Sequence, residues 1–554
     1  MRIGRQYFTA TLLTNGNVLV AGGRDASGVT TSSAELYDPS TGRWVMTGAM
    51  TTPRLQHTAT LLSDGKVLVA GGVNTTATSS AELYDPGTGL WTPTGSMDTP
   101  RTAHMATLIT TSTLSGMVIV AGGSSMCGGC TPILDSAELY DPSTGLWADT
   151  GSMTIGRYWD DPSPATLADG SILIVGGTTC CPYHWFNEAE LFDPVSQTWT
   201  PTSSKMTHAN ERTILLPNDL VLVAGGVSGT QPTAIYVAAA ELFDVTTGTW
   251  TATASMSTDR DVHTLTLLAN GQALAAGGAS GGWGVCNDLT SAELYDSSAG
   301  TWFLTGNMTV ARFYHTATLL PNGQVLAAGG TDCEGNILSS AELYTPPPGA
   351  TLSTTSLTFG VQLVGTRSAA QTAILTNTGT TTLTISSIAA SGDFIAQNNC
   401  GSSVPAGASC TIRVAFNPSA KGVRTGRVTI TDDAANSPQI IKLKGTGTVV
   451  QVSPSALDFG HQIVGTTSDP LTATLTNTGS EDLHISGVGL GGTNFGDFVE
   501  TTTCGSRLAV GGSCTIDVTF TPGARGDRHA SLKIVDDGGA SPQAVPLAGR
   551  GIPR

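Results

Sequence analysis

Short apolar runs alternate with turn-forming residues along the first two thirds of the chain. Four-residue runs such as Val18–Ala21 and Val67–Ala70 each end in a Gly-Gly pair and stand between polar, glycine-rich loops. Runs of this length bounded by glycine predict β-strands, and no long apolar stripe with the helical period of 3.6 residues competes with them. The pattern therefore predicts an all-β chain.

One sequence unit occurs seven times in this region. Its Gly-Gly pair begins at Gly22, Gly71, Gly122, Gly176, Gly225, Gly277 and Gly329. After each pair comes Ala-Glu-Leu-Tyr or Ala-Glu-Leu-Phe, and six of the units then carry a tryptophan: Trp44, Trp91, Trp147, Trp199, Trp250 and Trp302. A four-stranded unit of about 50 residues cannot cover both faces of its sheet alone, so we expect seven sheets packed face to face around an axis.

The details of the unit resemble the Kelch family. The second unit carries Arg54-x-x-His57-Thr, then Gly71-Gly72, then Ala81-Glu-Leu-Tyr84-Asp-Pro and finally Trp91. The resemblance implies a seven-bladed Kelch β-propeller over residues 1–346, with the tryptophan filling the gap between blades. The loops after each Gly-Gly pair then lie on the face of the disc where ligand recognition is expected.

The seventh unit departs from the pattern. It reaches Tyr344 and runs into Thr345-Pro-Pro-Pro-Gly349 without a tryptophan strand, and the segment from Met1 to Arg5 aligns with a position just after that strand in other units. We interpret this as an N-terminal truncation or a misplaced start codon. The seventh blade is expected to be frayed, because the missing tryptophan alone would bury 150–250 Å² of surface.

After residue 346 the repeat period changes to about 100 residues. Leu357-Thr-Phe-Gly recurs as Leu457-Asp-Phe-Gly, and Cys410-Thr-Ile-Arg-Val recurs as Cys514-Thr-Ile-Asp-Val. The alternation predicts strands with one buried face. The set resembles the abnormal-spindle and Hydin (ASH) type of immunoglobulin-like domain found in choice-of-anchor D proteins, which implies immunoglobulin-like β-sandwiches over residues 347–448 and 449–554. Their predicted role is that of a stalk.

Charge and hydropathy exclude two classes of partner. The net charge of −17 and a pI near 4.8 repel polyanions, so no nucleic-acid partner is expected. No apolar stretch approaches the roughly 18 residues that span a bilayer, so no membrane insertion is predicted for the chain as given. We expect a monomer.

The cysteines predict an oxidising compartment. Cys400 and Cys410 recur at the same spacing as Cys504 and Cys514, which indicates one local disulfide in each module. We therefore predict a bacterial-type exported protein, extracellular, on the cell surface or periplasmic, whose export signal is missing from this chain.

Six further cysteines lie in the propeller loops: Cys127, Cys130, Cys180, Cys181, Cys286 and Cys333. Loop-stapling disulfides are the favoured interpretation, with a bridge between Cys286 and Cys333 in neighbouring units. A four-cysteine zinc site of Cys127, Cys130, Cys180 and Cys181 is the alternative, although it would need unusual ligation by the vicinal pair Cys180 and Cys181. The connectivity stays open at this point.

The predicted ligand site combines aromatic and charged residues of units four to six. Exposed rings beside convergent polar groups suit a glycan or a protein ligand. The predicted ligand-binding residues are Tyr158, Trp159, Asp160, Asp161, Tyr183, Trp185, Asn210, Glu211, Arg260 and Trp283. The competing interpretation is that these rings merely cover long loops and that the charges are solvated variation.

Four histidines of the Arg-x-x-His motif lie near the inner rim, namely His57, His104, His263 and His315. A metal site is one interpretation. A hydrogen-bonding element repeated in every blade is the favoured one, and neither a metal nor a cofactor is predicted.

The leading functional hypothesis is a non-catalytic binding or adhesion protein. One alternative is a galactose-oxidase-like copper enzyme, since that family places Tyr-His where Tyr314 and His315 stand and Tyr7 can mimic a second tyrosine ligand. Against it, no segment leading into a blade contains cysteine, and the C-terminal modules do not resemble the family's domain that supplies a further histidine. A sugar-acid isomerase or hydrolase using Arg157, Asp160, Glu211 and Arg260 is a third hypothesis.

Overall fold

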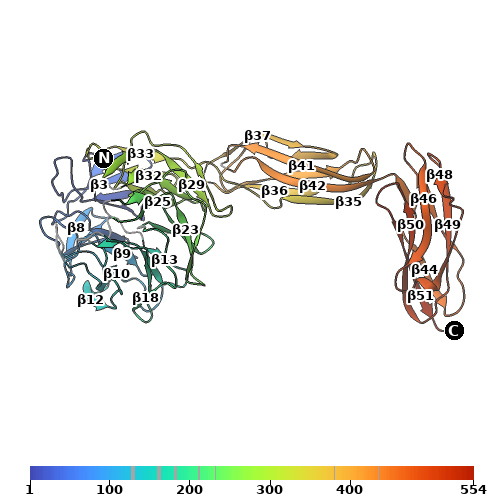
Figure 1. Cartoon of the computed structure of the whole chain (residues 1–554), viewed down its shortest axis with the longest axis horizontal. Coiled ribbons are helices and arrows are strands. Elements are labelled where there is room, and N and C mark those ends of the chain that lie inside the picture. Colours follow the sequence, from blue (N-terminus) through green and yellow to red (C-terminus); the bar gives the residue numbers. More distant parts are fainter. Residues whose placement is uncertain are drawn as a thin grey trace. The chain divides into compact units, whose positions relative to one another are not determined.

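A computed structural model describes the chain except for residues 126–131, 159–163, 180–183, 210–211, 231–232, 283, 380 and 435. The chain divides into two compact units, Met1–Pro346 and Pro347–Arg554 (Figure 1). Among the described residues, no helix is long and apolar enough to cross a membrane.

The first unit contains seven antiparallel sheets in which the strands follow one another in chain order. The first sheet consists of β1 (Thr9–Leu12), β2 (Val18–Ala21), β3 (Ala34–Asp38) and β4 (Arg43–Met46). The second sheet contains β5 (Thr58–Leu61), β6 (Val67–Ala70), β7 (Ala81–Asp85) and β8 (Leu90–Thr94), and the third contains β9 (Met105–Leu108), β10 (Val118–Ala121), β11 (Ala137–Asp141) and β12 (Leu146–Thr150). The fourth contains β13 (Ala165–Thr166), β14 (Ile172–Val175), β17 (Ala189–Asp193) and β18 (Thr198–Pro201), and the fifth contains β19 (Thr213–Leu215), β20 (Leu220–Ala224), β23 (Ala240–Asp244) and β24 (Thr249–Ala252). The sixth contains β25 (Thr264–Leu267), β26 (Ala273–Ala276), β29 (Ala292–Asp296) and β30 (Thr301–Leu304).

The seventh sheet has three strands, β31 (Thr316–Leu319), β32 (Val325–Ala328) and β33 (Ala341–Tyr344). The innermost strand β31 contacts β25 on one side and β1 on the other, which closes the ring of blades. Three hairpins extend the loops of the middle blades: β15 (Thr178–Thr179) with β16 (His184–Trp185), β21 (Val227–Ser228) with β22 (Ile235–Tyr236), and β27 (Ala279–Gly282) with β28 (Val285–Asp288).

The tryptophan of each fourth strand packs between blades. The Trp91 ring lies 5.0 Å from the Tyr84 ring of its own blade, and its indole N–H donates to the Gly48 carbonyl of the preceding blade at 2.8 Å. The same ring contact recurs in all six blades that carry this tryptophan. Because the ring joins two sheets, burying it stabilises the ring of blades as well as its own sheet.

The motif arginine ties the loops of its blade together. Arg54 donates to the Gly71 carbonyl at 2.7 Å and to the Glu82 carboxylate at 2.8 Å, and it is fully buried. The equivalent arginines, all 0% exposed, make the same bonds: Arg5, Arg101, Arg157, Arg260 and Arg312. A buried guanidinium without a carboxylate would be costly, so the Glu of the Ala-Glu-Leu motif is required by the arginine.

The motif histidine links one blade to the next. His57 Nε2 lies 3.1 Å from the Thr9 hydroxyl of the preceding blade, and His104 and His315 make the equivalent bond to Thr58 and Thr264. The imidazole occupies space that the first glycine of the pair leaves open, since a Cβ on Gly22 would lie 2.7 Å from His57 Cε1, and the Phe8 ring takes this place beside Gly329. The histidines and glycine pairs are therefore repeated because the blades interlock through them.

The second unit contains two β-sandwiches with the same topology. In the first sandwich, one sheet contains β34 (Ala350–Leu352), β36 (Gln371–Asn377), β40 (Ser409–Phe416) and β38 (Phe394–Asn398). The facing sheet contains β35 (Ser356–Leu363), β42 (Gln439–Thr448), β41 (Gly422–Asp432), β37 (Leu383–Ala390) and β39 (Ser403–Val404). In the second sandwich, one sheet contains β43 (Val450–Ser453), β45 (Leu471–Asn477), β49 (Ser513–Phe520) and β47 (Phe498–Thr502). The facing sheet contains β44 (Leu457–Ile463), β51 (Gln543–Ile552), β50 (Gly526–Asp536), β46 (Leu483–Gly491) and β48 (Arg507–Leu508). A short 3-10 turn, η1 (Phe495–Asp497), precedes β47. Each has its own apolar core.

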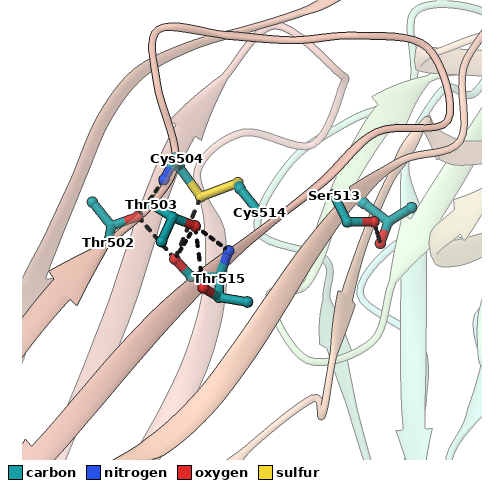
Figure 2. The surroundings of a disulfide bond; sticks show 7 residues. Thr502, Thr503, Cys504, Ser513, Cys514 and Thr515 are labelled. Atoms are coloured by element: carbon teal, nitrogen blue, oxygen red, sulfur yellow. Dashed lines mark hydrogen bonds between the residues drawn. A yellow bond between two sulfur atoms is a disulfide. The ribbon is translucent and has the colours of Figure 1, made fainter.

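Three disulfides are present among the described residues. Cys400–Cys410 and Cys504–Cys514 close the predicted ten-residue loops, and Cys286–Cys333 joins the loops of the sixth and seventh blades. Figure 2 shows the second of these, where Thr503 accepts a hydrogen bond from the Thr515 amide at 2.9 Å beside the bridge. Cys127, Cys130, Cys180 and Cys181 lie outside the described residues.

Candidate functional site

The inner ends of the blades enclose a pocket of about 280 Å³ on the propeller axis. Its wall comes from the innermost strands and from the segments that lead into them. The polar or aromatic lining residues are Tyr7, Phe8, Thr9, Gln56, His57, Thr58, His104, Arg212, Thr264, Tyr314, His315 and Thr316. No described lining residue is an aspartate, a glutamate or a cysteine, so hydroxyl, amide, imidazole and guanidinium groups supply its chemistry.

A ring of backbone hydrogen bonds positions the side chains at the mouth of this pocket. The third residue of the motif segment, which precedes the histidine or, in the first blade, Phe8, has a positive φ, as in Tyr7 (55°), Gln56 (51°), Ala103 (51°) and Tyr314 (50°). The Gln56 amide donates to the Tyr7 carbonyl at 3.1 Å, and the Ala103 amide donates to the Gln56 carbonyl at 3.0 Å. Left-handed backbone is unfavourable for such residues, so these bonds between successive blades hold the strained conformation in place.

The two tyrosines of this ring form an aromatic wall. Tyr7 belongs to the first blade and Tyr314 to the seventh, and their ring centroids are 4.6 Å apart with the planes tilted by 46°. Both side chains are half-buried. Gln56 stands next to Tyr7 around the ring, so an apolar ring face and a side-chain amide border the same opening.

The imidazoles below this wall are neutral near pH 7. Burial, and then the neighbouring Arg54, lowers the pKa of His57 to about 3. Burial, and then Arg312 and Arg212, lowers the pKa of His315 to about 3 as well. These groups can therefore donate or accept hydrogen bonds at the pocket but carry no charge there.

The fifth blade supplies the only arginine among the described lining residues. Its motif arginine is replaced by His208, which lies 3.0 Å from Glu241, and Arg212 stands where the first, second, sixth and seventh blades have a threonine. His263 of the sixth blade has no hydrogen-bond partner among the described residues for either ring nitrogen. The threonine that would accept its bond is the residue that Arg212 replaces.

Two arginines that we expected at the ligand face lie in the interior instead. Arg260 was predicted to bind the ligand, but it is 0% exposed and donates to the Gly277 carbonyl and to Glu293. Arg157, predicted as a catalytic candidate of the isomerase or hydrolase hypothesis, is likewise 0% exposed and bonds Glu190 at 2.6 Å. Both belong to the structural set, because each is the first residue of the repeated motif.

The structure brings two of the predicted aromatic residues together. Tyr158 exchanges backbone hydrogen bonds with Thr178, which pairs on its other side with Trp185, and both aromatic side chains are half-buried. Neither is among the residues that line the axial pocket. The other predicted site residues, Trp159, Asp160, Asp161, Tyr183, Asn210, Glu211 and Trp283, lie outside the described residues.

The axial pocket was not predicted as the binding site from the sequence. Tyr7 and Tyr314 were predicted there only as ligands in the copper hypothesis, and Gln56 and Arg212 were not predicted as ligand contacts. A signal was present in the two middle positions of the Arg-x-x-His motif, which vary between blades while the arginine repeats; the third position is Tyr, Gln, Ala or Val in the blades whose motif segment the structure describes in full. A varying position inside a repeated motif is where specificity is expected.

Comparison with known families agrees with this architecture. The Kelch motif family matches residues 7–51 and 54–98. The HYDIN/CFA65/VesB-like Ig-like domain matches residues 448–550, and a family described as a protein of unknown function (DUF1573) matches residues 351–447. The chain carries a Kelch propeller followed by Ig-like domains. The Kelch matches cover the first two blades.

Two curated relatives of the Kelch propeller are galactose oxidases of Gibberella zeae, one of them from strain PH-1. Each is 28% identical over 109 residues, which is 18% of this chain and 15% of the relative. The match thus spans less than a sixth of the length of those relatives. It corrects the expectation that this is a non-catalytic protein, because the relatives that the propeller matches are enzymes.

One solved structure similar to this chain is described as a novel fungal alcohol oxidase with catalytic diversity among the AA5 family, in complex with copper. It is 18% identical, with a TM-score of 0.49, and the match covers 79% of this chain and 97% of that chain.

Proposed function

We propose that the axial pocket of the Kelch propeller binds a single sugar unit of an extracellular or cell-surface carbohydrate, with the two Ig-like modules as a stalk. The observation that carries this is the Tyr7–Tyr314 wall at the mouth of a small polar pocket. A sugar ring presents an apolar face to an aromatic ring and hydroxyl groups to amides and hydroxyls, and this opening offers both.

The size of the pocket favours a sugar over a protein ligand. A cavity of about 280 Å³ lies near the lower end of the range for small-molecule sites, roughly 300–1,000 Å³. A stable protein partner needs a contact surface of about 800 Å² on each side, which a narrow axial opening does not offer. The three disulfides support a location in an oxidising compartment.

Binding of a glycan panel by the full-length chain tests this proposal. Tyr7→Ala and Tyr314→Ala should each weaken binding at least tenfold, because each removes half of the aromatic wall. Trp185→Ala is the matched control, since it removes a half-buried ring outside the pocket. Unchanged affinity in both tyrosine variants, with loss in Trp185→Ala, would return the site to the loops of the middle blades and overturn the proposal.

A second candidate is oxidation of an alcohol group of the bound sugar. It is favoured by the position of Tyr7, Tyr314 and His315 in one pocket and by the activity for which the curated relatives are named. The donor set does not fit a copper centre well: the imidazole nitrogen of His315 nearest the pocket hydroxyls bonds Thr264 at 3.2 Å, and the cationic Arg212 lines the same space. We therefore derive no step through copper.

Hydrogen peroxide release from galactose and primary alcohols, measured after loading with Cu(II), tests this second candidate. Tyr314→Phe separates the two functions, because it keeps the ring that contacts a sugar and removes the phenol oxygen. Peroxide release by the native chain that Tyr314→Phe abolishes supports oxidation. Peroxide release unaffected by this change would contradict a role for the tyrosine pair.

A further inference from the structure

The first Ig-like module carries a polar pocket beside its disulfide. The pocket measures about 260 Å³ and lies where β38 pairs with β40, next to the two bridged cysteines in the sequence. Its described lining residues are all polar, namely Gln397, Asn398, Asn399, Thr411 and Arg413. No aspartate or glutamate is among these described residues. An occupant of the pocket must therefore be polar on every side that this wall contacts.

The register of the sheet places the lining side chains on one face. Gln397 on β38 lies directly opposite Arg413 on β40, and the Asn399 amide donates to the Thr411 carbonyl at 3.2 Å. Residues directly opposite each other share a face of the sheet, and so do residues two positions apart on one strand. Gln397 and Arg413 are both exposed. Among the described residues, neither of these two side chains has a hydrogen-bond or ion-pair partner.

The two asparagines of the pocket have their side-chain oxygens occupied. The Asn398 oxygen accepts the Cys400 amide at 3.1 Å, and the Asn399 oxygen accepts the Thr411 amide at 2.7 Å. A backbone N–H can only donate, so these two bonds identify the oxygen of each side-chain amide and leave its NH2 group available to a ligand. Neither NH2 group has an acceptor among the described residues. The two asparagines therefore present donors to the pocket.

The second Ig-like module makes the same backbone bonds without these donors (Figure 2). Thr502 and Thr503 stand in place of the two asparagines, and their hydroxyls accept the Cys504 and Thr515 amides at 2.9 Å. The same hydroxyls donate to the Thr515 carbonyl at 3.2 and 3.3 Å. The local fold beside the disulfide therefore does not require asparagine, and the NH2 groups of the first module are free to serve another purpose.

Charge differs between the two modules in the same direction. Asp517 takes the place of Arg413 in the second module and accepts a hydrogen bond from the Thr472 hydroxyl. Residues 347–448 contain seven Lys or Arg and three Asp, whereas residues 449–554 contain six Lys or Arg and ten Asp or Glu. The net charge of −17 thus includes one module with an excess of positive charge. Because charges in physiological salt act over about 8 Å, an anion in the pocket interacts with Arg413 more than with the rest of the chain.

We propose that this pocket binds an anionic substituent, a carboxylate or a sulfate ester, on a sugar unit of an acidic polysaccharide. Arg413 makes a charge-assisted hydrogen bond to the anion, and the NH2 groups of Asn398 and Asn399 donate to its oxygens or to neighbouring hydroxyls. A peptide side chain or a lipid gains affinity by burying apolar surface, which this wall does not offer. The first Ig-like module then recognises a ligand itself, and this role does not depend on the axial pocket.

Binding of acidic polysaccharides by the full-length chain tests this proposal. Oligogalacturonate supplies carboxylates, dextran sulfate supplies sulfate esters, and dextran supplies neither. At about 0.15 M salt, at least one acidic polymer should bind about tenfold or more tightly than dextran, and the polymer that binds identifies the anion. Arg413→Asp, which introduces the residue of the second module, should weaken this binding by about tenfold or more. Lys442→Asp is the matched control: it makes the same change of charge at an exposed position on the other sheet, and it should change the affinity by less than about threefold.

The double substitution Asn398→Thr with Asn399→Thr provides the second arm. It keeps both backbone bonds, as the second module does, and removes the two NH2 donors, so it should weaken binding by about threefold or more. The calorimetric transition of the second unit should stay unchanged.

Three results would overturn the proposal: neither acidic polymer binds more tightly than dextran, Arg413→Asp and Lys442→Asp lose affinity equally, or the double asparagine variant keeps full affinity. Binding to vesicles of anionic phospholipid but to neither acidic polymer, lost in Arg413→Asp, would assign the pocket to a membrane surface and would also overturn it.

Discussion

The buried imidazoles around the axis make the propeller sensitive to mild acid. His57 and His315 have pKa values lowered to about 3, first by burial and then by nearby arginines. In the unfolded chain each returns to about 6.5. Between these two values the unfolded state binds more protons than the native state, so the free energy of unfolding falls as the pH drops below about 6.5.

The magnitude follows from the gap between the working pH and 6.5. At pH 5 the unfolded histidine gains about 2 kcal/mol from protonation that the native histidine cannot share, since one pKa unit is worth about 1.4 kcal/mol. Any native pKa below about 4 gives nearly this figure. His57 and His315 together therefore remove about 4 kcal/mol between pH 7.5 and pH 5. His104 and His263, whose pKa values are also lowered by burial, act in the same direction.

Tryptophan fluorescence isolates this effect, because all nine tryptophans precede residue 303 and report on the propeller alone. Denaturant unfolding at the two pH values gives the difference in free energy of unfolding. His57→Phe is the control: Phe8 takes the same place in the first blade, and the variant should lose about 2 kcal/mol of the pH dependence. Equal stability of the native chain at pH 5 and pH 7.5 would refute the reasoning.

Three further predictions concern the contacts that hold each unit together. Gly22→Ala should lower the free energy of unfolding by several kcal/mol more than Gly28→Ala. Both residues have a positive φ, but a Cβ at position 22 would lie 2.5 Å from a carbonyl oxygen, while position 28 is open. Equal denaturation midpoints of the two variants would contradict this. Glu138→Gln should cost about 3–5 kcal/mol by leaving the Arg101 guanidinium buried without its carboxylate, measured by tryptophan fluorescence, and a loss below 1 kcal/mol would show that the charge pair is dispensable. Cys410→Ser should remove about 3 kcal/mol from the first Ig-like module by opening a ten-residue loop; calorimetry should show a lower transition for the second unit and an unchanged propeller transition.

The fold was predictable because each contact that defines a blade is repeated. Trp91 follows Tyr84 by seven residues, and this pair recurs at the same spacing in six blades. The pair of Arg54 with Glu82 also recurs in six blades, at spacings of 28 to 37 residues. The disulfide of each Ig-like module was predictable for the same reason, since one spacing occurs twice.

The candidate site was harder to predict, because ring closure and not sequence spacing brings its residues together. Tyr7 and Tyr314 are 307 positions apart and become neighbours only when the first blade meets the seventh. Arg260 misled the sequence analysis for a related reason: it stands among charged residues in a divergent segment, yet it is the first residue of the repeated motif and is therefore buried.

Arg212 marks a position near the propeller axis where a stabilising hydrogen bond between two blades is missing. In place of a threonine that links two blades, the fifth blade puts a guanidinium into the pocket wall, and His263 is left without its hydrogen bond among the described residues. A buried polar group without a partner costs about 1–3 kcal/mol. The neighbouring interlock, where His263 fills the space beside Gly225, is kept. Loss of a hydrogen bond at a position that faces the pocket, while the packing behind it is retained, is the pattern expected of a residue kept for what it does in the pocket.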